Sequence, residues 1–345
     1  ESYNPNKIMK QFKAVNWNTP ENDYVEMFWE QNLKQFWIDT EYIPSKDIDS
    51  WKSLSPELRE AYKKALGGLT LLDTLQSHTG MPKVIDHIEG LQNKSVLSYM
   101  CMMEAIHAKS YSTIFTTVAS TTEIDAIFEW ASTNEQLQFK AKTIDSYYRK
   151  LDKENVSKEE IYMALVASVM LETFLFYSGF FLPLWLAGQG QMVASCDIIK
   201  KIIADESIHG VFVGLLAQEI FNTFSEKKKE KLKAELFILM DMLYENEMKY
   251  TDHVYSDVGL GSEVKEYIRY NGNKALMNLG FECGNDATRF LLQKIDQLRK
   301  DPRGGTSSRR GFRHEKRIGD GDLIVFIYFS LSLPHKSSFY HFFNR

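Results

Sequence analysis

The chain has 345 residues, of which 44% are hydrophobic and 25% charged, and only 19 are Gly and 8 are Pro. This composition supports a sizeable buried core and favours helices, which excludes a largely disordered chain and a sheet-rich fold. The formal net charge of −5 comes from 41 basic and 46 acidic residues. An acidic chain of this kind does not indicate nucleic-acid binding.

Six segments with apolar residues at helical spacing and no strand alternation predict an all-α fold. In the first, 55–72, Ser55 and Pro56 mark the start of a helix that continues through Asp73 and Thr74. A Gly-Gln-Gly sequence at 188–190 predicts a loop between two helices, because it does not follow a strand. The remaining predicted helices are 95–119, 122–151, 157–187, 196–224 and 226–255.

The longest apolar stretch, 161–187, is long enough to raise the question of a membrane span. It carries Glu172 near its middle and Pro183 near its end. Because an unpaired carboxylate in lipid is costly, a helix buried on all sides within a bundle explains this stretch better than a membrane span does.

The cysteines Cys101, Cys196 and Cys283 lie far apart and show no CxxC spacing, so the sequence predicts neither a disulfide framework nor a thiolate zinc site. Such thiols suit a reducing compartment. The first residues contain no basic segment followed by an apolar one, as a secretory signal would. We therefore expect a cytoplasmic location.

Two stretches carry a Glu-x-x-His motif, Glu104 with His107 and Glu206 with His209. On a helix, residues three apart share a face, so the carboxylate and the imidazole can converge on one cation. A single pair of this kind is more often a surface contact than a metal site. The significance of the two motifs therefore depends on which other acids accompany them.

Two further acids, Asp73 and Glu172, have apolar neighbours on nearly every side of their predicted helices. We expect both to be buried, where a carboxylate needs a partner, a proton or a metal. The alternative is a core in which they pair with Lys or Arg, but few basic residues lie in these segments. Four carboxylates and two imidazoles from four helices are the ligand set of a di-iron or dimanganese bundle. The sequence supplies that set once, as Asp73, Glu104, His107, Glu172, Glu206 and His209.

Tyr111 follows His107 by four residues, so we expect it one turn along the same helix face, near the metals. A phenol beside a high-valent metal pair can lose an electron and a proton, and apolar neighbours would shield the resulting radical. Phe176, Phe180 and Ile202 are predicted to form that shield, although ordinary core packing explains the same residues equally well.

With these residues in place, the chain resembles the small, radical-generating subunit of class Ib ribonucleotide reductases over roughly 16–282. Several motifs in the family's order make coincidence implausible. They include VNWN at 15–18, KQFW at 34–37, GLTLLDTLQ at 68–76, MEAIHAKSYSTIF at 103–115, LETFLFYSGFFLP at 171–183, IIADESIHG at 202–210 and YNGNKALMNLGFE at 270–282.

The resemblance implies a ferritin-like helical bundle with a dinuclear metal site in its core. Tyr111 matches the radical-bearing tyrosine, and Trp37, joined through Asp205 to His107, would begin the path by which the radical leaves the site. The implied ligands are Asp73, Glu104 and His107 for one metal ion and Glu172, Glu206 and His209 for the other, with Glu104 and Glu206 as bridges.

The family's function is implied in the same way. Two manganese or iron ions oxidise the tyrosine with an oxygen species, which a small flavodoxin-like activator protein delivers in class Ib. The hole then passes to a cysteine of a separate large (alpha) subunit, which reduces ribonucleoside diphosphates to deoxyribonucleotides. The small subunit is a homodimer in the family.

Two other functions remain as alternatives. One is another ferritin-like dimetal carboxylate oxidase, which Tyr111 and Trp37 disfavour. The other is an inactive interaction partner, which the intact set of ligands disfavours.

The resemblance stops after Glu282, so the sequence predicts a radical-generating domain at 1–282 and an atypical tail at 283–345. The tail holds 12 Lys and Arg against 6 Asp and Glu, and neither Tyr328 nor Tyr340 lies in the surroundings of the family's relay tyrosine. We interpret the tail as the product of a reading-frame change or an unspliced intervening sequence, with a genuinely divergent tail as the alternative.

Overall fold

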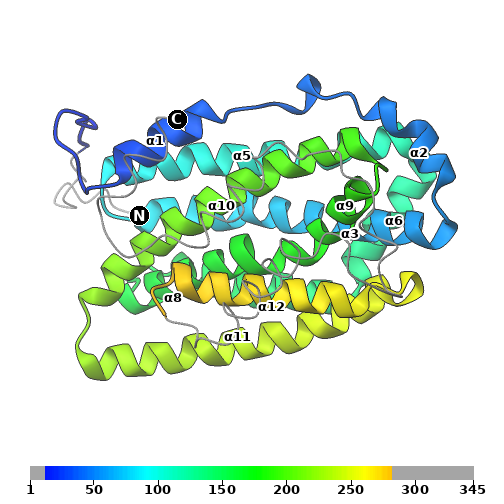
Figure 1. The fold of residues 1–345 in the computed structure, drawn as a ribbon. Helices are drawn as coiled ribbons and strands as arrows, with labels where there is room; N and C mark the ends of the chain where they lie inside the picture. Colours follow the sequence, from blue (N-terminus) through cyan, green and yellow to red (C-terminus); the bar gives the residue numbers. More distant parts are fainter. Residues whose placement is uncertain (1–11, 282–345) are drawn as a thin grey trace, which may run out of the picture.

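The computed structural model describes residues 12–281, and within this range the chain is helical and contains no strand (Figure 1). The all-α prediction is confirmed. The helices are α1 (Val25–Lys34), α2 (Ile48–Ser53), α3 (Pro56–Leu75), α4 (Met81–His87), α5 (Leu91–Val118), α6 (Thr121–Thr133), α7 (Glu135–Arg149), α8 (Lys158–Met170), α9 (Tyr177–Gly188), α10 (Val193–Asn222), α11 (Glu226–Tyr255) and α12 (Gly261–Asn278).

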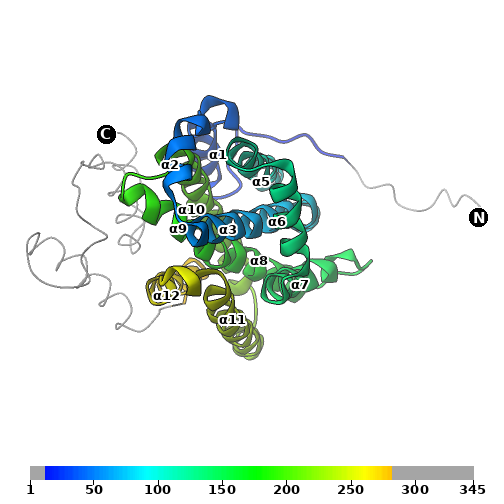
Figure 2. The same cartoon turned by 90° about the vertical axis from the view of Figure 1, so that its right-hand side faces the viewer.

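Four long helical segments form the centre of the bundle. Helices α3, α5 and α10 pack with the segment made of α8 and α9, and the most extensive contacts are those of α8 with α10 and of α3 with α5. Viewed nearly end on, α11 and α12 lie on one side of this centre and α1 and α2 on the other (Figure 2). The faces of these four segments that point toward one another are therefore shielded from water, which is the setting that buried polar side chains require.

Several helices begin where the sequence offers a side-chain cap. The Ser55 side chain accepts a hydrogen bond from the Leu58 backbone, and Pro56 occupies the first turn of α3. Ser120 with Glu123 and Ser157 with Glu160 form capping boxes at the starts of α6 and α8. These local signals explain why the starts of the corresponding predicted helices are correct to within one residue.

The predicted single helix at 122–151 is wrong, because two helices, α6 and α7, occupy this region. Asn134 separates them, with an extended backbone and a side chain that accepts a hydrogen bond from the Leu137 backbone as the N-cap of α7. Helix α5 also begins four residues earlier than predicted. Its start is capped by the carboxylate of Glu21, which is distant in sequence and accepts from the Leu91 and Gln92 backbones.

The predicted helix at 157–187 is interrupted by a π turn, Leu171–Leu175, between α8 and α9. A second π turn, Gln76–Gly80, joins α3 to α4. Single π turns inside helices change the direction of the side chains around them and often lie at functional sites. One of these turns contains Glu172 and the other begins three residues after Asp73.

The segment Lys158–Gly188 is long and apolar enough to cross a membrane by length and composition alone, but 94% of its most apolar window is buried inside the bundle. Its apolar residues are covered by other helices, notably α3, α10 and α12. Burial in the core therefore accounts for its composition. The predicted tail at 283–345 lies outside the described residues.

We expect Gly214→Ala to destabilise the fold. A Cβ at this position of α10 would lie 2.9 Å from the carbonyl carbon of Asn278, so α10 and α12 would have to move apart. The free energy of unfolding, measured by urea denaturation of metal-free protein at fixed concentration, should fall by about 1–3 kcal/mol. Gly188→Ala is the matched control, because nothing lies within 4 Å of its Cβ position. Equal losses in both variants would contradict the packing described.

Candidate metal centre

Six side chains from the four central segments meet in the core, and all six are fully buried. Their donor atoms fall into two overlapping groups, and within each group the atoms lie within 4.8 Å of one another. Glu104 and Glu206 belong to both groups. The first group is Asp73, Glu104, His107 and Glu206, and the second is Glu104, Glu172, Glu206 and His209.

Most carboxylate oxygens of this cluster lack a hydrogen-bond partner. Both oxygens of Asp73 and of Glu206 have none, and neither does one oxygen each of Glu104 and Glu172. Within residues 12–281, none of the four acids pairs with Lys or Arg, so the alternative of a salt-bridged core does not describe this site. Unpartnered buried carboxylates are strongly disfavoured unless a cation or a proton neutralises them. The donor set therefore fits a pair of metal ions.

The pKa values of the acids in this cluster reflect the same conflict between charge and burial. Burial, followed by the negative charge of Glu104, raises the pKa of Asp73 and of Glu206 well above the ordinary value. Burial also acts to raise the pKa of Glu104, but His107 and His209 outweigh it and lower this pKa to about 2. Without metal, the site must therefore distribute protons among its acids and histidines, and a bound cation would displace them.

Each histidine directs its Nδ1 atom toward the carboxylates. His107 Nδ1 lies 3.0 Å from Glu206 Oε1, and His209 Nδ1 lies 2.7 Å from Glu104 Oε1 and 3.1 Å from Glu172 Oε2. The Glu-x-x-His spacing on α5 and α10 produces this arrangement, because residues three apart share a helix face. The imidazole nitrogens and the carboxylates are thus directed at the same small volume.

Trp37, Asp205 and His107 form a continuous hydrogen-bonded chain. The Trp37 indole Nε1 donates to Asp205 Oδ2 at 2.7 Å, and the same oxygen lies 2.9 Å from His107 Nε2. The Trp37 and His107 rings are nearly parallel, with centroids 5.9 Å apart. An outer carboxylate of this kind fixes the tautomer and orientation of an imidazole.

Gln35, which was not among the predicted site residues, donates from Nε2 to Asp205 Oδ1 at 2.9 Å. It lies just after α1, outside any helical periodicity, and only its place in the KQFW motif could have drawn attention to it. Both oxygens of Asp205 are therefore occupied by donors. This fixes the plane of the carboxylate between Trp37 and His107.

Tyr111 is fully buried on α5, one turn after His107. Its hydroxyl has no hydrogen-bond partner of good geometry. Burial, followed by the nearby charges of Asp73 and Glu206, raises the pKa of Tyr111 well above its ordinary range. The hydroxyl therefore keeps its proton at neutral pH and faces the acidic cluster.

The three residues predicted to shield Tyr111 all lie in the core. Phe176, Phe180 and Ile202 are fully buried, and the two phenyl centroids are 6.1 Å apart. Their burial is consistent with both the shielding role and ordinary packing. The shielding role stays a prediction.

A hydrogen-bond network around Glu172 was not predicted either. Gln76 and Ser168 both donate to Glu172 Oε1, and Tyr148 in turn donates to Gln76. No spacing rule identifies these residues, because they come from three different elements. The GLTLLDTLQ motif ends on Gln76 but gives no indication of its partner.

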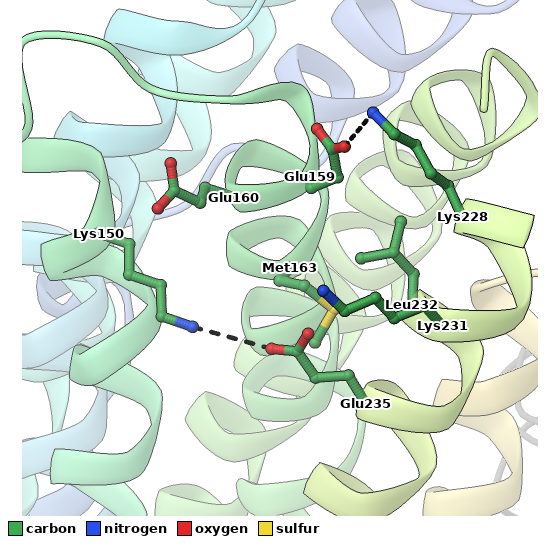
Figure 3. A pocket seen from close by; sticks show the side chains of 8 residues that line it. All are labelled: Lys150, Glu159, Glu160, Met163, Lys228, Lys231, Leu232 and Glu235. Carbon is green, nitrogen blue, oxygen red and sulfur yellow. Dashed lines mark ion pairs between the residues drawn. The ribbon is translucent and has the colours of Figure 1, made fainter. Parts of the chain in front are cut away.

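A surface pocket lies elsewhere, between the end of α7, the start of α8 and α11 (Figure 3). It is lined mainly by charged side chains that form ion pairs with one another, including Lys228 with Glu159 and Lys150 with Glu235. None of the candidate site residues lines it. We therefore assign the chemistry to the buried cluster and not to this pocket.

A helical bundle that buries four carboxylates and two histidines in this arrangement belongs to the class of ferritin-like dimetal carboxylate proteins. The family model for the ribonucleotide reductase small chain matches residues 14–283. This chain therefore belongs to the ribonucleotide reductase small-chain family.

Individual relatives agree with this assignment. The chain is 50% identical over 276 residues to ribonucleoside-diphosphate reductase subunit beta of Bacillus subtilis, covering 80% of this chain and 83% of that protein. It is 38% identical over 274 residues to ribonucleoside-diphosphate reductase 2 subunit beta of Escherichia coli, covering 79% and 83%. The solved structure of dimanganese(II) NrdF from Streptococcus sanguinis is similar with a TM-score of 0.75 and 44% identity, covering 79% of this chain and 93% of that one. The NrdF relatives are consistent with class Ib.

We expect Asp73→Asn to stabilise the metal-free chain and to weaken its response to metal. An acid whose pKa is raised by folding costs stability at neutral pH, because the folded chain must keep an unfavourable charge or take up a proton. The metal-free unfolding temperature should rise by a few degrees. A ligand present at 100 times its Kd stabilises a folded protein by ~2.7 kcal/mol. At the Mn(II) concentration that gives this stabilisation in the wild type, Asp73→Asn should be stabilised by much less.

Glu247→Gln is the matched control, since Glu247 is equally buried but pairs with Lys140 at 3.0 Å outside the cluster. It should lower the metal-free unfolding temperature, because it leaves a buried cation without its partner. The Mn(II)-induced shift should stay at the wild-type value. Thermal unfolding followed by circular dichroism, with and without Mn(II), measures both quantities. A full Mn(II) shift in Asp73→Asn would contradict the site.

Proposed function

We propose that the buried cluster of this ribonucleotide reductase small subunit holds two metal ions and that Tyr111 is the side chain oxidised beside them. The observation that carries the proposal is the pair of overlapping donor groups that share Glu104 and Glu206. A shared pair of carboxylates is the arrangement needed to bridge two cations. Tyr111 lies next to the same cluster on α5.

Each metal ion would have its own terminal ligands in addition to the bridges. Asp73 and His107 occur only in the first donor group, and Glu172 and His209 only in the second. The unpartnered oxygens of the four acids are the atoms available for coordination. Oxygen-rich ligation with one nitrogen per metal suits manganese(II) and iron(II).

When bound, and once an external oxygen-derived oxidant has removed electrons from it, the metal pair would take one electron from the phenol of Tyr111. The residues of the chain then have three tasks. Burial excludes water from the phenol, and the carboxylate of Asp73 is placed to receive the proton that the hydroxyl releases. Phe176, Phe180 and Ile202 provide apolar surroundings that would slow the quenching of a tyrosyl radical.

The hydrogen-bonded chain from His107 through Asp205 to Trp37 provides an exit for the radical. Asp205 holds the indole N–H, so electron transfer from Trp37 can be accompanied by a proton shift onto this carboxylate. As a small subunit, the chain pairs with the large (alpha) subunit, where ribonucleotides are reduced to deoxyribonucleotides, and it forms a homodimer. Trp37 would begin the path toward that partner.

Manganese is favoured as the metal by the similarity to the dimanganese(II) NrdF of Streptococcus sanguinis. We further propose that a flavodoxin-like activator protein delivers the oxidant and that both proteins act in the cytoplasm. The support for the activator is the class Ib character of the motifs around the six ligands. Iron can occupy the same oxygen-rich donors.

A ferritin-like oxidase of another kind is the second candidate. An R2-like ligand-binding oxidase with a Mn/Fe cofactor has the same fold, with a TM-score of 0.65, but at 17% identity it supports the fold alone. The names of the more similar relatives do not favour this candidate. Electron paramagnetic resonance separates the two, because substrate oxidation without a tyrosyl signal would support the oxidase.

We expect Tyr111→Phe to abolish the tyrosyl radical without removing the metals. The phenyl ring fills the same buried space, so the donor cluster stays in place, but the oxidisable hydroxyl is gone. Electron paramagnetic resonance after loading with Mn(II) or Fe(II) and the matching oxidant measures the radical. Metal content by elemental analysis is the control and should equal that of the wild type. A persistent tyrosyl signal in this variant would show that another tyrosine carries the radical.

We expect Trp37→Phe to separate radical formation from turnover. Phenylalanine keeps an aromatic ring in the core but loses the N–H donor to Asp205. The tyrosyl signal should remain, while nucleotide reduction with the large subunit should fall by roughly 100-fold. Trp51→Phe is the control, because Trp51 is also buried but packs against Tyr62 and does not reach Asp205. Wild-type turnover by Trp37→Phe would exclude this path.

A further inference from the structure

Gln76 is a fully buried amide at the first position of the π turn Gln76–Gly80, one turn beyond Asp73. It joins the metal cluster to α7 and α8. Its Nε2 donates to Ser168 Oγ at 2.9 Å and also to Glu172 Oε1. Its Oε1 accepts a hydrogen bond from the Tyr148 hydroxyl at 2.6 Å. Every polar atom of this side chain therefore has a partner.

The orientation of the Gln76 amide follows from its two neighbours. An ionised carboxylate only accepts hydrogen bonds, so the side of Gln76 that faces Glu172 must be the NH₂ group. Tyr148 supports the same orientation from the other side, because its hydroxyl donates to the amide oxygen. A flipped amide would place two acceptors against each other at Glu172, and it would force the Tyr148 hydroxyl to accept a hydrogen bond where it now donates one.

The backbone makes room for this arrangement at Gly80. A Cβ at Gly80 would lie 2.5 Å from Gln76 Oε1 and 2.5 Å from Tyr148 Cε2. Only glycine lets the π turn bring Gln76 and Tyr148 together. Glu172 lies in the other π turn, Leu171–Leu175. The two π turns therefore carry the two partners of the hydrogen bond between Gln76 and Glu172.

The network acts on one oxygen of Glu172 only. Oε1 accepts from Gln76 and, at 3.3 Å, from Ser168, whereas Oε2 has no hydrogen-bond partner and lies 3.1 Å from His209 Nδ1. Among the four acids of the cluster, Asp73 and Glu206 have no hydrogen-bond partner at either oxygen. In Glu172, Oε1 is therefore held by hydrogen bonds, whereas Oε2 is available to coordinate a metal ion.

We infer that Gln76, oriented by Tyr148, is a positioning residue for Glu172. By holding Oε1, it would let Glu172 coordinate a metal ion through Oε2 alone. This would leave a coordination position open at the metal ion that Glu172 and His209 both bind. This rests on the proposed function, because it takes Glu172 and His209 as ligands. A carboxylate without the anchor can rotate and offer both oxygens to the same cation. The hydrogen bond from Gln76 would therefore determine whether that metal ion keeps a coordination position free for an oxidant.

Gln76→Leu tests this inference against Gln92→Leu as the matched control. Gln92 is also buried and uses its amide in several hydrogen bonds, but these join α5 to the residues around Thr19 and Glu21, far from the cluster. Both variants lose a buried amide and should lose comparable stability. Only Gln76→Leu should change the electron paramagnetic resonance spectrum of the dimanganese(II) form and the Mn(II) affinity, by ~10-fold.

Tyr148→Phe is a second variant that leaves Gln76 and all ligands in place. It removes the group that orients the amide, so we expect the same spectral change in weaker form. Wild-type spectra and Mn(II) binding in both Gln76→Leu and Tyr148→Phe, or equal changes in Gln92→Leu, would overturn the inference. If the wild-type chain itself failed to bind two Mn(II) ions, the metal site would be wrong, which is a distinct result.

Discussion

The structure depends on the burial of four carboxylates and two histidines in the middle of a helical bundle. No Lys or Arg among the described residues pairs with these acids, and most of their oxygens have no hydrogen-bond partner. A core of this kind is unfavourable by itself. Two bound cations would neutralise these buried charges. Without metal, the same charges lower the stability of the fold.

Two hydrogen-bonded anchors hold opposite parts of the cluster. Asp205 orients His107 and is itself fixed by Trp37 and Gln35, whereas Gln76 holds one oxygen of Glu172. Among the other ligands, His209 and Glu104 are in hydrogen-bond contact with each other, whereas neither oxygen of Asp73 or Glu206 has a hydrogen-bond partner. The two anchored parts are those to which we assign a proposed task, the exit of the radical at Trp37 and an open metal position beside Glu172. Tyr111 lies beside Asp73, and burial together with the nearby acidic groups keeps the proton on its hydroxyl.

The sequence predicted the parts of this site that follow from local spacing. The Glu-x-x-His motifs and the apolar surroundings of Asp73 and Glu172 identified the cluster, because helix periodicity fixes which side chains share a face. The break at Asn134 was missed although its cause is local, an N-cap hydrogen bond from the Leu137 backbone. The early start of α5 depends on Glu21, which is distant in sequence, and the two π turns depend on a local change in helix winding. Gln35 and Gln76 were missed because their partners come from other helices.

The proposed function requires two metal ions between these six side chains. Anomalous diffraction at the manganese absorption edge, from crystals of the Mn(II)-loaded chain, would locate them. We expect two peaks, one beside Asp73 and His107 and one beside Glu172 and His209, with Glu104 and Glu206 between them. A single peak, or manganese bound only at the protein surface, would contradict the proposed function.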